Sequence, residues 1–261
     1  MIDPSPDDIY NDGSYLQNNP DAHVSDSFFK FTQLLPLLDT IASPEKDFCI
    51  LDIGGGAGVL GHLVSLYFHH RNLNVRTTAV DVSTSMLAMQ KVNNPFITEI
   101  IAGDAATAFI GGARFDLTLA IDVFEHMPDY HLALQAIQKG SKWLVCNMPI
   151  ERNLVDILRN ICMRNRYYAE QTRSIGHLHF FSYRRHLREF REYFDVICVE
   201  FSPYWRIVLQ VPSPSHKQQL QNRLRRLELK ISRWVSTLIP WAAPWIVQGS
   251  CFSLSNRRKV R

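Results

Sequence analysis

The sequence predicts an α/β fold with a doubly wound, mostly parallel sheet and helices on both faces of that sheet. The first observation is an apolar run at residues 48–53, followed by glycines at alternate positions and then by apolar residues at helical spacing. This order of strand, glycine turn and helix opens a nucleotide-binding βαβ unit. The second observation is that further strand-like runs alternate with helical patterns along the chain. Such alternation is typical of a parallel sheet with right-handed crossovers.

The first expected element is a helix that follows an irregular lead segment, residues 1–24. Ser25 or Asp26 can cap its start, and Pro36 is expected to bend it or end it early. One face of this helix is apolar at helical spacing and should be buried. The residues of that face are Phe28, Phe31, Leu34, Leu35 and Leu38.

Five strands are expected next, at residues 49–53, 75–80, 97–102, 115–121 and 143–148. Helical patterns such as residues 59–70 and 85–92 lie between most of them. In sheets of this kind, ligands bind beyond the carboxyl ends of the strands, near the point where the strand order reverses. The residues just past those ends are therefore the candidates for a binding site.

The glycine loop fits two classes of cofactor. Residues 56–61 form the pattern G-x-G-x-x-G, and Asp81 lies 20 residues further on, as a dinucleotide site requires. In a dinucleotide site, however, the first glycine directly follows the strand, and here that glycine is Gly54. Asp52 lies at the end of the strand, where its carboxylate offers no favourable interaction to a diphosphate. A cationic, phosphate-free ligand such as S-adenosylmethionine can use that carboxylate directly or through water, and its own carboxylate can bind the loop amides.

Three successive strands end in a carboxylate, namely Asp52, Asp81 and Asp104. Asp81 is placed to accept hydrogen bonds from ribose hydroxyls, and Asp104 from an adenine amino group. Together they form an anionic crescent that suits an adenosine carrying a cation and repels a diphosphate. The alternative is that each aspartate only caps the helix or turn that follows it.

Four motifs resemble those of the class I, Rossmann-like S-adenosylmethionine-dependent methyltransferases. They are Asp52-Ile-Gly-Gly-Gly-Ala-Gly58, Ala79-Val-Asp-Val-Ser83, Ala102-Gly-Asp-Ala105, and Phe115-Asp-Leu with Val123-Phe-Glu-His-Met-Pro128. They follow the family's order and spacing over about 80 residues. The fourth is closest to a branch with a Leu-Glu-His element, where this chain has Phe124 in place of leucine.

The resemblance implies a seven-stranded sheet whose last strand, residues 250–259, is antiparallel, with helical insertions after strands five and six. It implies that the loop from Gly54 to Gly58 holds the methionine part of the cofactor, Asp81 the ribose and Asp104 the adenine. The cofactor-binding residues expected on this basis are Asp52, Gly54, Gly56, Gly58, Asp81, Val82, Asp104, Ala105 and Asp122.

The length of 261 residues fits one α/β domain with distinct parts. Residues 1–45 form a lead segment and helix that are expected to gate the site, and residues 46–150 form the cofactor-binding core. Residues 151–261 are the C-terminal half of the same domain, beginning with an insertion at 151–175. In this half, residues 176–182, a helix at 183–193 and a strand at 194–201 are similar to the family's next loop, helix and strand. A second insertion, 215–245, is also expected to cover the substrate.

The second insertion raises the question of a membrane. Residues 215–238 have an amphipathic pattern with several basic residues, and residues 234–256 contain no charge. An uncharged stretch of this length is long enough for a transmembrane helix, but Pro240 and Pro244 argue against one. We expect a helix end, a proline turn and a core strand. The alternative is a basic amphipathic helix that makes a peripheral membrane contact through residues 215–245.

Composition narrows the class of protein further. The net charge of +3 is too small to indicate nucleic-acid binding by itself. The five cysteines are dispersed without paired spacing, which is typical of reduced thiols in a cytosolic protein. The N-terminus is acidic and rich in proline, unlike a signal peptide. We therefore expect a cytoplasmic protein that binds no nucleic acid.

Histidines are the candidates for proton transfer. A hydroxyl acceptor of a methyl group must lose its proton, and histidine can accept that proton at neutral pH. His126 follows the fourth strand, while His177 and His179 share a later loop; His126 and His177 are the expected catalytic residues. The alternative for His126 is that it only orients the neighbouring backbone. Glu125 and these histidines lack a diagnostic metal-ligand spacing, so no metal is expected.

The function expected from the residues and the resemblance is methyl transfer from S-adenosylmethionine to a small-molecule or lipid-like acceptor, by O-methylation of a hydroxyl. C-methylation of an activated ring is an alternative that needs no strong base. An NAD-dependent oxidoreductase and a non-catalytic cofactor-binding module are alternatives from other classes.

Overall fold

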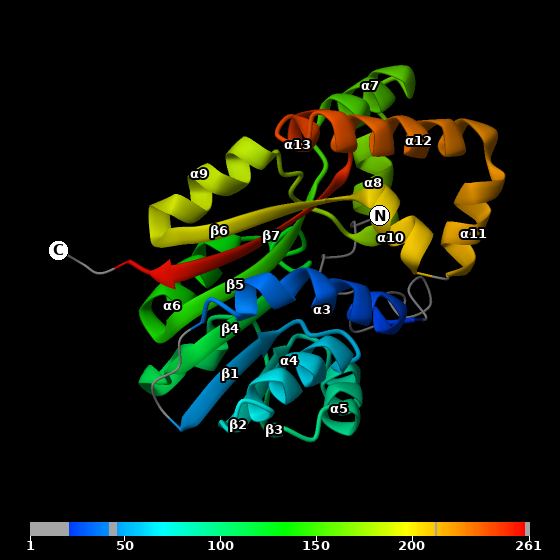
Figure 1. Cartoon of the computed structure of the whole chain (residues 1–261). Coiled ribbons are helices and arrows are strands. Elements are labelled where there is room, and N and C mark those ends of the chain that lie inside the picture. The colour runs from blue at the N-terminus through cyan, green and yellow to red at the C-terminus, as the bar shows by residue number, and fades with distance from the viewer. Residues whose placement is uncertain (1–20, 42–45, 212, 259–261) are drawn as a thin grey trace, which may run out of the picture.

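The structure is a computed structural model that describes residues 21–41, 46–211 and 213–258. The lead segment expected to gate the site lies outside these residues up to position 20, so that part of the expectation stays a prediction. A single sheet runs through the described chain, with helices packed on both of its faces (Figure 1).

The sheet has seven strands in the order β3-β2-β1-β4-β5-β7-β6. Strand β7 is antiparallel to both of its neighbours, β5 and β6, and the other strand pairs are parallel. This arrangement confirms the predicted fold class. The strands are β1 (Asp47–Ile53), β2 (Asn74–Asp81), β3 (Ile97–Ala102), β4 (Phe115–Ile121), β5 (Ser141–Ile150), β6 (Phe194–Pro203) and β7 (Gly249–Arg257).

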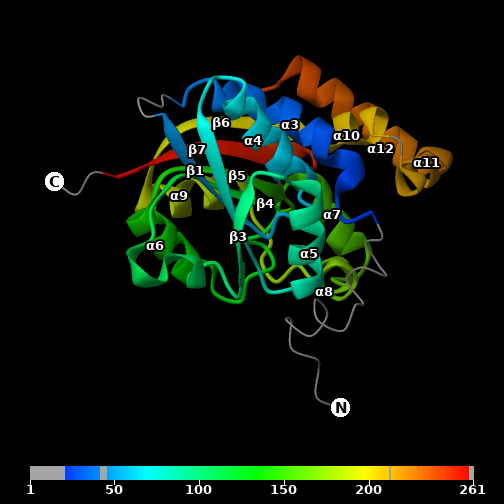
Figure 2. The ribbon, with the colours of Figure 1, turned by 90° about the horizontal axis from the view of Figure 1, so that it is seen from below.

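Alternate residues of the central strands fill two separate cores, because successive side chains point to opposite faces. On one face, Ile50 of β1 and Leu117 of β4 pack against α3 (Val24–Leu38) and α4 (Val59–His69). On the other, their neighbours on the same strands pack against α6 (Tyr130–Gly140) and α9 (Tyr183–Tyr193). Figure 2 shows the two pairs of helices on opposite sides of the sheet. Helix α5 (Thr84–Asn93) packs on β2 and β3.

Helical insertions follow β5 and β6, as predicted. Helices α7 (Leu154–Cys162) and α8 (Tyr167–Ile175) precede α9. Helices α10 (Tyr204–Gln210), α11 (Pro214–Gln221), α12 (Arg223–Leu238) and α13 (Ala243–Ile246) lie between β6 and β7. The single amphipathic pattern at 215–238 is thus two helices, because Asn222 is extended and its side chain caps α12 by accepting from the amides of Leu224 and Arg225.

The uncharged stretch at 234–256 is the end of α12, the short α13 and most of β7, which confirms the prediction of a helix end, a turn and a core strand. None of the helices in the described parts of the chain combines the length and the apolar character needed to cross a membrane.

The predicted buried face of the first helix is partly wrong. Helix α3 begins at Val24, and neither Ser25 nor Asp26 caps it. Phe28 is 68% exposed, whereas Phe29 and Lys30 are buried. The helix is rotated relative to the prediction because the ammonium group of Lys30 is held inside by two carboxylates, a contact that an apolar pattern does not reveal.

Candidate active site

Two pockets lie at the carboxyl ends of the strands. The smaller has a volume of about 390 Å³, within the range of small-molecule sites. Most of the residues predicted to bind a cofactor line it, and only Asp52 and Gly58 do not. The predicted residues in its wall are Gly54, Gly56, Asp81, Val82, Asp104, Ala105 and Asp122.

The glycine loop has a backbone that other residues rarely adopt. The φ angles of Gly54, Gly56 and Gly58 are +60°, +55° and +82°. A Cβ atom on Gly56 would lie 2.9 Å from the carbonyl oxygen of Ala22, and one on Gly58 would lie 2.7 Å from the Cα of Gln90. Side chains are therefore excluded, and the loop forms a tight turn between β1 and α4, here called the glycine cradle, with Gly54 and Gly56 in the pocket wall.

Asp52 lies beneath this loop instead of in the pocket. Its carboxylate points toward Gly55 and Gly61, so closely that a Cβ on Gly61 would lie 2.1 Å from Oδ2. The strand explains this, since Ile53 faces the pocket and Asp52, one residue earlier, faces the other side. Burial and, to a smaller extent, the charge of Asp81 raise the pKa of the Asp52 carboxyl to about 7. The geometry thus does not support the expected direct contact between Asp52 and a cofactor.

Asp81 and Asp104 line the pocket, and each also accepts hydrogen bonds from the residues that follow it. Asp81 accepts from the Ser83 amide at 2.9 Å and from Gln90 Nε2 at 3.2 Å. Burial outweighs these hydrogen bonds and raises the pKa of Asp81 to about 6. Asp104 is exposed, and its Oδ1 accepts from the amide and the hydroxyl of Thr107 at 2.9 and 2.7 Å.

The charge of the smaller pocket discriminates between cofactors. Its described wall contains the carboxylates of Asp81, Asp104, Asp122 and Asp129, and neither lysine nor arginine. A diphosphate would meet only like charge there, whereas an adenosine that carries a sulfonium cation would be attracted. The cradle without Cβ atoms and the carboxylate at the end of β2 therefore fit S-adenosylmethionine.

A larger pocket, of about 660 Å³, adjoins the first. Helices α3, α8, α10 and α12 contribute to its wall, together with residues at the ends of β5 and β7. Three residues line both pockets: His23, Asp122 and His126. A group in the larger pocket can therefore meet a group in the smaller one at His126.

His126 is fixed in one tautomer by its surroundings. Its Nδ1 lies 3.2 Å from the carbonyl oxygen of Gly176, so Nδ1 carries the proton and donates it, and Nε2 of the neutral ring is the acceptor nitrogen. Burial and, to a smaller extent, the neighbouring His177 lower the pKa of His126 to about 4. The imidazole is therefore neutral at physiological pH.

The later loop brings His177, but not His179, into the site. The backbone amides of Leu178 and His179 donate to the carbonyl oxygen of Glu125, which ties the loop to the end of β4. The ring of His177 lies 4.8 Å from that of His126, and its Nδ1 donates to Glu151 at 2.9 Å. His179 lines neither pocket, and its Nε2 lies 2.9 Å from the carbonyl oxygen of Met127.

Glu125, His126 and His177 form a group that could hold a metal ion, since one ligand atom from each lies within 4.8 Å of the others. Glu125 is fully buried, and neither carboxylate oxygen has a hydrogen-bond partner among the described residues. Burial, and next the charge of Asp122, raise the pKa of Glu125 well above its usual range, which favours its neutral form. The sequence expectation that no metal is bound stays a prediction.

Sequence reasoning missed Lys30, which ties the first helix to the site. Its ammonium group is buried and lies 2.8 Å from Asp26 and 2.7 Å from Asp122. Asp122, which was predicted to bind the cofactor, also accepts from Asn147 Nδ2 at 2.6 Å. The two carboxylates hold the pKa of Lys30 above its usual value despite burial. The sequence did contain a signal of this contact, because Lys30 interrupts the apolar pattern of the helix.

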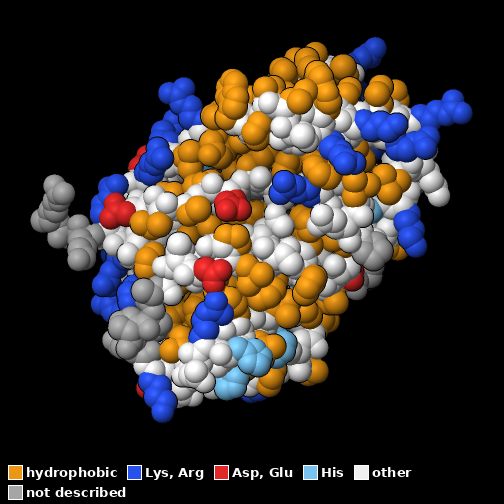
Figure 3. Space-filling view, viewed as in Figure 1, with side chains coloured by type: hydrophobic (Ala, Val, Ile, Leu, Met, Phe, Trp, Pro, Cys, Tyr) orange, Lys and Arg blue, Asp and Glu red, His pale blue; other side chains and the backbone are white. Residues whose placement is uncertain are grey.

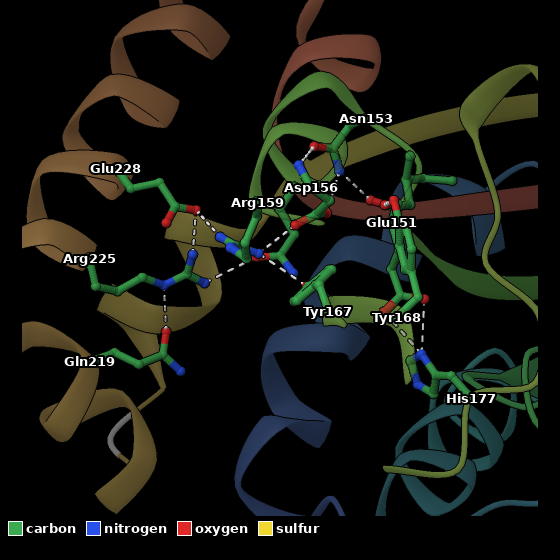
Figure 4. A network of polar contacts seen from close by, with 12 residues as sticks. Glu151, Asn153, Asp156, Arg159, Tyr167, Tyr168, His177, Gln219, Arg225 and Glu228 are labelled. Atoms are coloured by element: carbon green, nitrogen blue, oxygen red, sulfur yellow. Dashed lines mark hydrogen bonds and ion pairs between the residues drawn. The ribbon is translucent and has the colours of Figure 1, made fainter. Parts of the chain in front are cut away.

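A network of arginines was also missed, because its members lie on separate helices. Glu228 of α12 accepts from Arg159 of α7 at 2.5 Å and from Arg225. Arg159 also contacts Asp156 at 2.5 Å and the hydroxyl of Tyr167 at 3.1 Å. Figure 4 shows these side chains pointing toward one another from α7, α8 and α12, beside the pair of Glu151 and His177. The network joins the two insertions over the larger pocket.

The fold and the pocket define a class I S-adenosylmethionine-dependent methyltransferase: a seven-stranded sheet with an antiparallel last strand, a glycine cradle after β1 and a carboxylate after β2. Comparison with protein families agrees with this class. Residues 23–231 match the family described as "Methyltransferase domain", and the chain belongs to this family. The alternative of an NAD-dependent oxidoreductase is therefore wrong.

Three solved structures with a similar fold are methyltransferases of different acceptor classes. One is phosphoethanolamine N-methyltransferase 2 of Haemonchus contortus in complex with S-adenosyl-L-methionine, with a TM-score of 0.55 and 15% identity over 87% of this chain and 53% of that chain. Another is coclaurine N-methyltransferase, with a TM-score of 0.57 and 17% identity over 88% of this chain and 70% of that chain. A third is geranyl diphosphate C-methyltransferase from Streptomyces coelicolor A3(2), with a TM-score of 0.56 and 12% identity over 88% of this chain and 79% of that chain.

These likenesses show the fold. The chain spans about half the length of the Haemonchus enzyme. No curated protein sequence matches this chain.

Proposed function

We propose that this methyltransferase transfers its methyl group to a hydroxyl of a small-molecule or lipid-like acceptor, with His126 as the general base. The observation that carries the proposal is that His126 lies in the wall shared by the two pockets. A base must reach the proton of the acceptor while the acceptor oxygen faces the methyl donor. The shared wall is the place where one side chain can meet both requirements.

The cofactor is proposed to occupy the smaller pocket. The loop from Gly54 to Gly58 and the start of α4 would hold its methionine part, Asp81 its ribose and Asp104 its adenine, with Val82, Ala105 and Asp122 completing the wall. When bound, S-adenosylmethionine supplies an electrophilic methyl group on a sulfonium. Asp52, beneath the loop, is proposed to act on the cofactor only through the loop that it supports.

The proton is proposed to move to Nε2 of His126. The hydrogen bond from Nδ1 to Gly176 holds the ring in the tautomer that can accept it. A pKa of about 4 keeps the ring unprotonated, although it also makes the ring a weaker base than an exposed histidine. His177, oriented by Glu151, is the second proposed catalytic residue, because its ring lies beside His126 in the wall of the larger pocket.

The acceptor is proposed to occupy the larger pocket. This placement gives each of the three parts of the chain a proposed role. Residues 46–150 form the cofactor-binding core. Within residues 1–45, Lys30 of α3 and His23 just before that helix contribute to the wall of the larger pocket. The insertions 151–175 and 215–245 cover the acceptor, which is supported by the residues of α7, α8 and α12 in the same wall. We also propose that 215–245 contacts a membrane on its cytoplasmic side, and that no nucleic acid is bound.

Turnover with methyl-labelled S-adenosylmethionine and a fractionated cell extract tests this function. We expect a labelled product whose methyl group is an ether by NMR. A product methylated on ring carbon would favour C-methylation, which needs no strong base. Binding of S-adenosylhomocysteine without any labelled product would favour the non-catalytic module.

A further inference from the structure

The insertions carry a large apolar surface that no described part of the chain covers. On α7, Leu154, Ile157, Leu158 and Ile161 share one face and are between 44% and 61% exposed. The second set lies on α12 and just after it. Its members, between 49% and 79% exposed, are Leu224, Leu227, Ile231, Trp234, Leu238, Trp241 and Trp245. Helix α13 contacts both α7 and α12, and Figure 3 shows apolar side chains gathered over these three helices.

Helices α7 and α12 are amphipathic, but their polar sides face the protein and their apolar sides face outward. The polar side of α7 faces inward, where Asp156 is buried and Arg159 reaches Glu228. On α12, Arg225 and Glu228 also turn inward, and Arg225 Nη2 contacts Gln248 at 3.0 Å. The apolar sides face outward. A helix in a soluble protein normally buries its apolar face and exposes its polar face, so this orientation requires an apolar partner outside the molecule.

Basic residues border the apolar surface on α12. Arg223, Arg226, Lys230 and Arg233 are exposed, and helical spacing places them on a strip beside the apolar face. Within α12, which is fully described, Glu228 is the one carboxylate, and it faces the arginine network. An apolar face with tryptophans and a basic border matches the interface of an anionic bilayer, where acyl chains lie beneath negative headgroups.

We infer that the surface formed by α7, α12 and α13, here called the apolar platform, seats the protein on an anionic membrane, and that the acceptor is a lipid of that membrane. The inference about the acceptor rests on the proposed function. Leu224 belongs both to the apolar platform and to the wall of the larger pocket, and its neighbours Asn222 and Arg225 line that wall as well. The larger pocket therefore reaches the apolar platform at Leu224, and this is where a lipid of the bilayer would enter it.

Vesicle flotation of the full chain tests the inference. We expect flotation at low salt with vesicles of phosphatidylglycerol and phosphatidylcholine in equal parts, and release as salt rises. Leu158→Glu with Ile161→Glu, or Leu227→Glu with Trp234→Glu, should weaken the partition by about tenfold or more for each side chain, the scale of a leucine returned to water. Replacement of Arg226 or Lys230 by Gln should weaken it by about fivefold for each charge.

A matched control carries the same charge change at exposed apolar positions elsewhere. Val92→Glu with Ile110→Glu, at side chains that are 82% and 76% exposed on other elements, should float like the wild type. No flotation of the wild type at low salt, or equal flotation of the platform variants and the wild type, would overturn the inference. A dimer in light scattering that the platform variants dissociate, without flotation, would assign the surface to a second copy and overturn it as well.

A failure of the proposed methyl transfer can be told apart from a failure of the membrane inference. Flotation is measured with S-adenosylhomocysteine and therefore does not depend on turnover. A chain that floats but yields no methylated product would refute the methyl transfer and leave the bilayer contact. A chain that methylates a water-soluble acceptor at full rate and never floats would refute the membrane and its lipid alone.

Discussion

At the scale of single residues, His126 is the side chain whose environment matters most for the proposed chemistry. It is half-buried between two pockets, and its ring donates a hydrogen bond to a backbone carbonyl. His126→Ala should slow turnover by about 10²–10⁴-fold, the usual contribution of a positioned base, and change the affinity for S-adenosylhomocysteine by only a few-fold. Radiometric turnover and calorimetry measure the two effects.

The pH profile gives a second readout for His126. A protonated ring cannot accept a proton, so the rate falls below the pKa of the imidazole. For an unperturbed ring this limb would lie near pH 6.5, but burial lowers the pKa to about 4. The rate at saturating cofactor should therefore stay level down to about pH 5. His179→Ala is the control, because that ring also contacts a backbone carbonyl but lies outside both pockets. A near-normal kcat in His126→Ala would contradict the proposal that His126 is the general base.

Asp81 is expected to act on cofactor affinity. Its carboxylate is held by Ser83 and Gln90 at the edge of the smaller pocket, and the ionised form accepts hydrogen bonds from hydroxyls best. Asp81→Asn should weaken S-adenosylhomocysteine by about 2–4 kcal/mol, the scale of charge-assisted hydrogen bonds. Because the pKa of Asp81 is raised to about 6, wild-type affinity should fall as pH drops below 6, and the variant should lack this dependence. A variant with unchanged affinity and a lower Tm would make Asp81 only a cap.

Asp52 is expected to act on stability. Its pKa is raised from an unfolded value near 4 to about 7, so the folded state binds the proton more tightly. A raised pKa contributes stability that is complete below the unfolded pKa and is lost as pH rises through the folded pKa. Asp52→Asn cannot ionise, so it should exceed the wild type in unfolding free energy by about 2–4 kcal/mol at pH 8 and match it near pH 4. A stability difference that does not change with pH would contradict this assignment.

At the scale of elements, Glu228 connects the two insertions, because it accepts from Arg159 on α7 and Arg225 on α12. Glu228→Gln should loosen the insertions by about 1–3 kcal/mol, the cost of losing hydrogen bonds to a charged group. Hydrogen exchange should quicken in α7 and α12 and stay unchanged in the sheet. Glu192→Gln, an exposed carboxylate on α9, is the control. Equal exchange in the Glu228 variant and the wild type would mean that apolar packing alone holds the insertions.

At the scale of the whole molecule, the fold was predictable because its signals are local. The central strands β1 and β4 are mostly apolar, and the glycines of the loop mark the turn after β1. The strands β1 to β4 therefore match their predicted positions closely. The prolines of the uncharged C-terminal stretch correctly indicated that it is not one long helix.

The parts of the site that the sequence missed depend on contacts between distant segments. The side chains of Arg159 and Glu228 meet across 69 positions, and His126 meets the Gly176 carbonyl across 50. No local pattern reports such pairs. The buried face of α3 was partly wrong for the same reason, since Lys30 turns inward to reach Asp122, a residue on another element. The orientation of Asp52 depends on which side of a strand end faces the loop, and the spacing of glycines and acids does not encode it.

The wall shared by the two pockets has a consequence for kinetics. His23, Asp122 and His126 contact both spaces, and the carbonyl of Ala22, just before α3, accepts from the amide of Ala57 in the glycine loop at 3.1 Å. We expect that a ligand bound in one pocket restricts the exchange of a ligand in the other. Initial-rate plots should intersect, as for a ternary complex, and the demethylated cofactor should leave only after the methylated product. Parallel plots would contradict a ternary complex. A product-inhibition pattern of random release would show that the two pockets release their products independently.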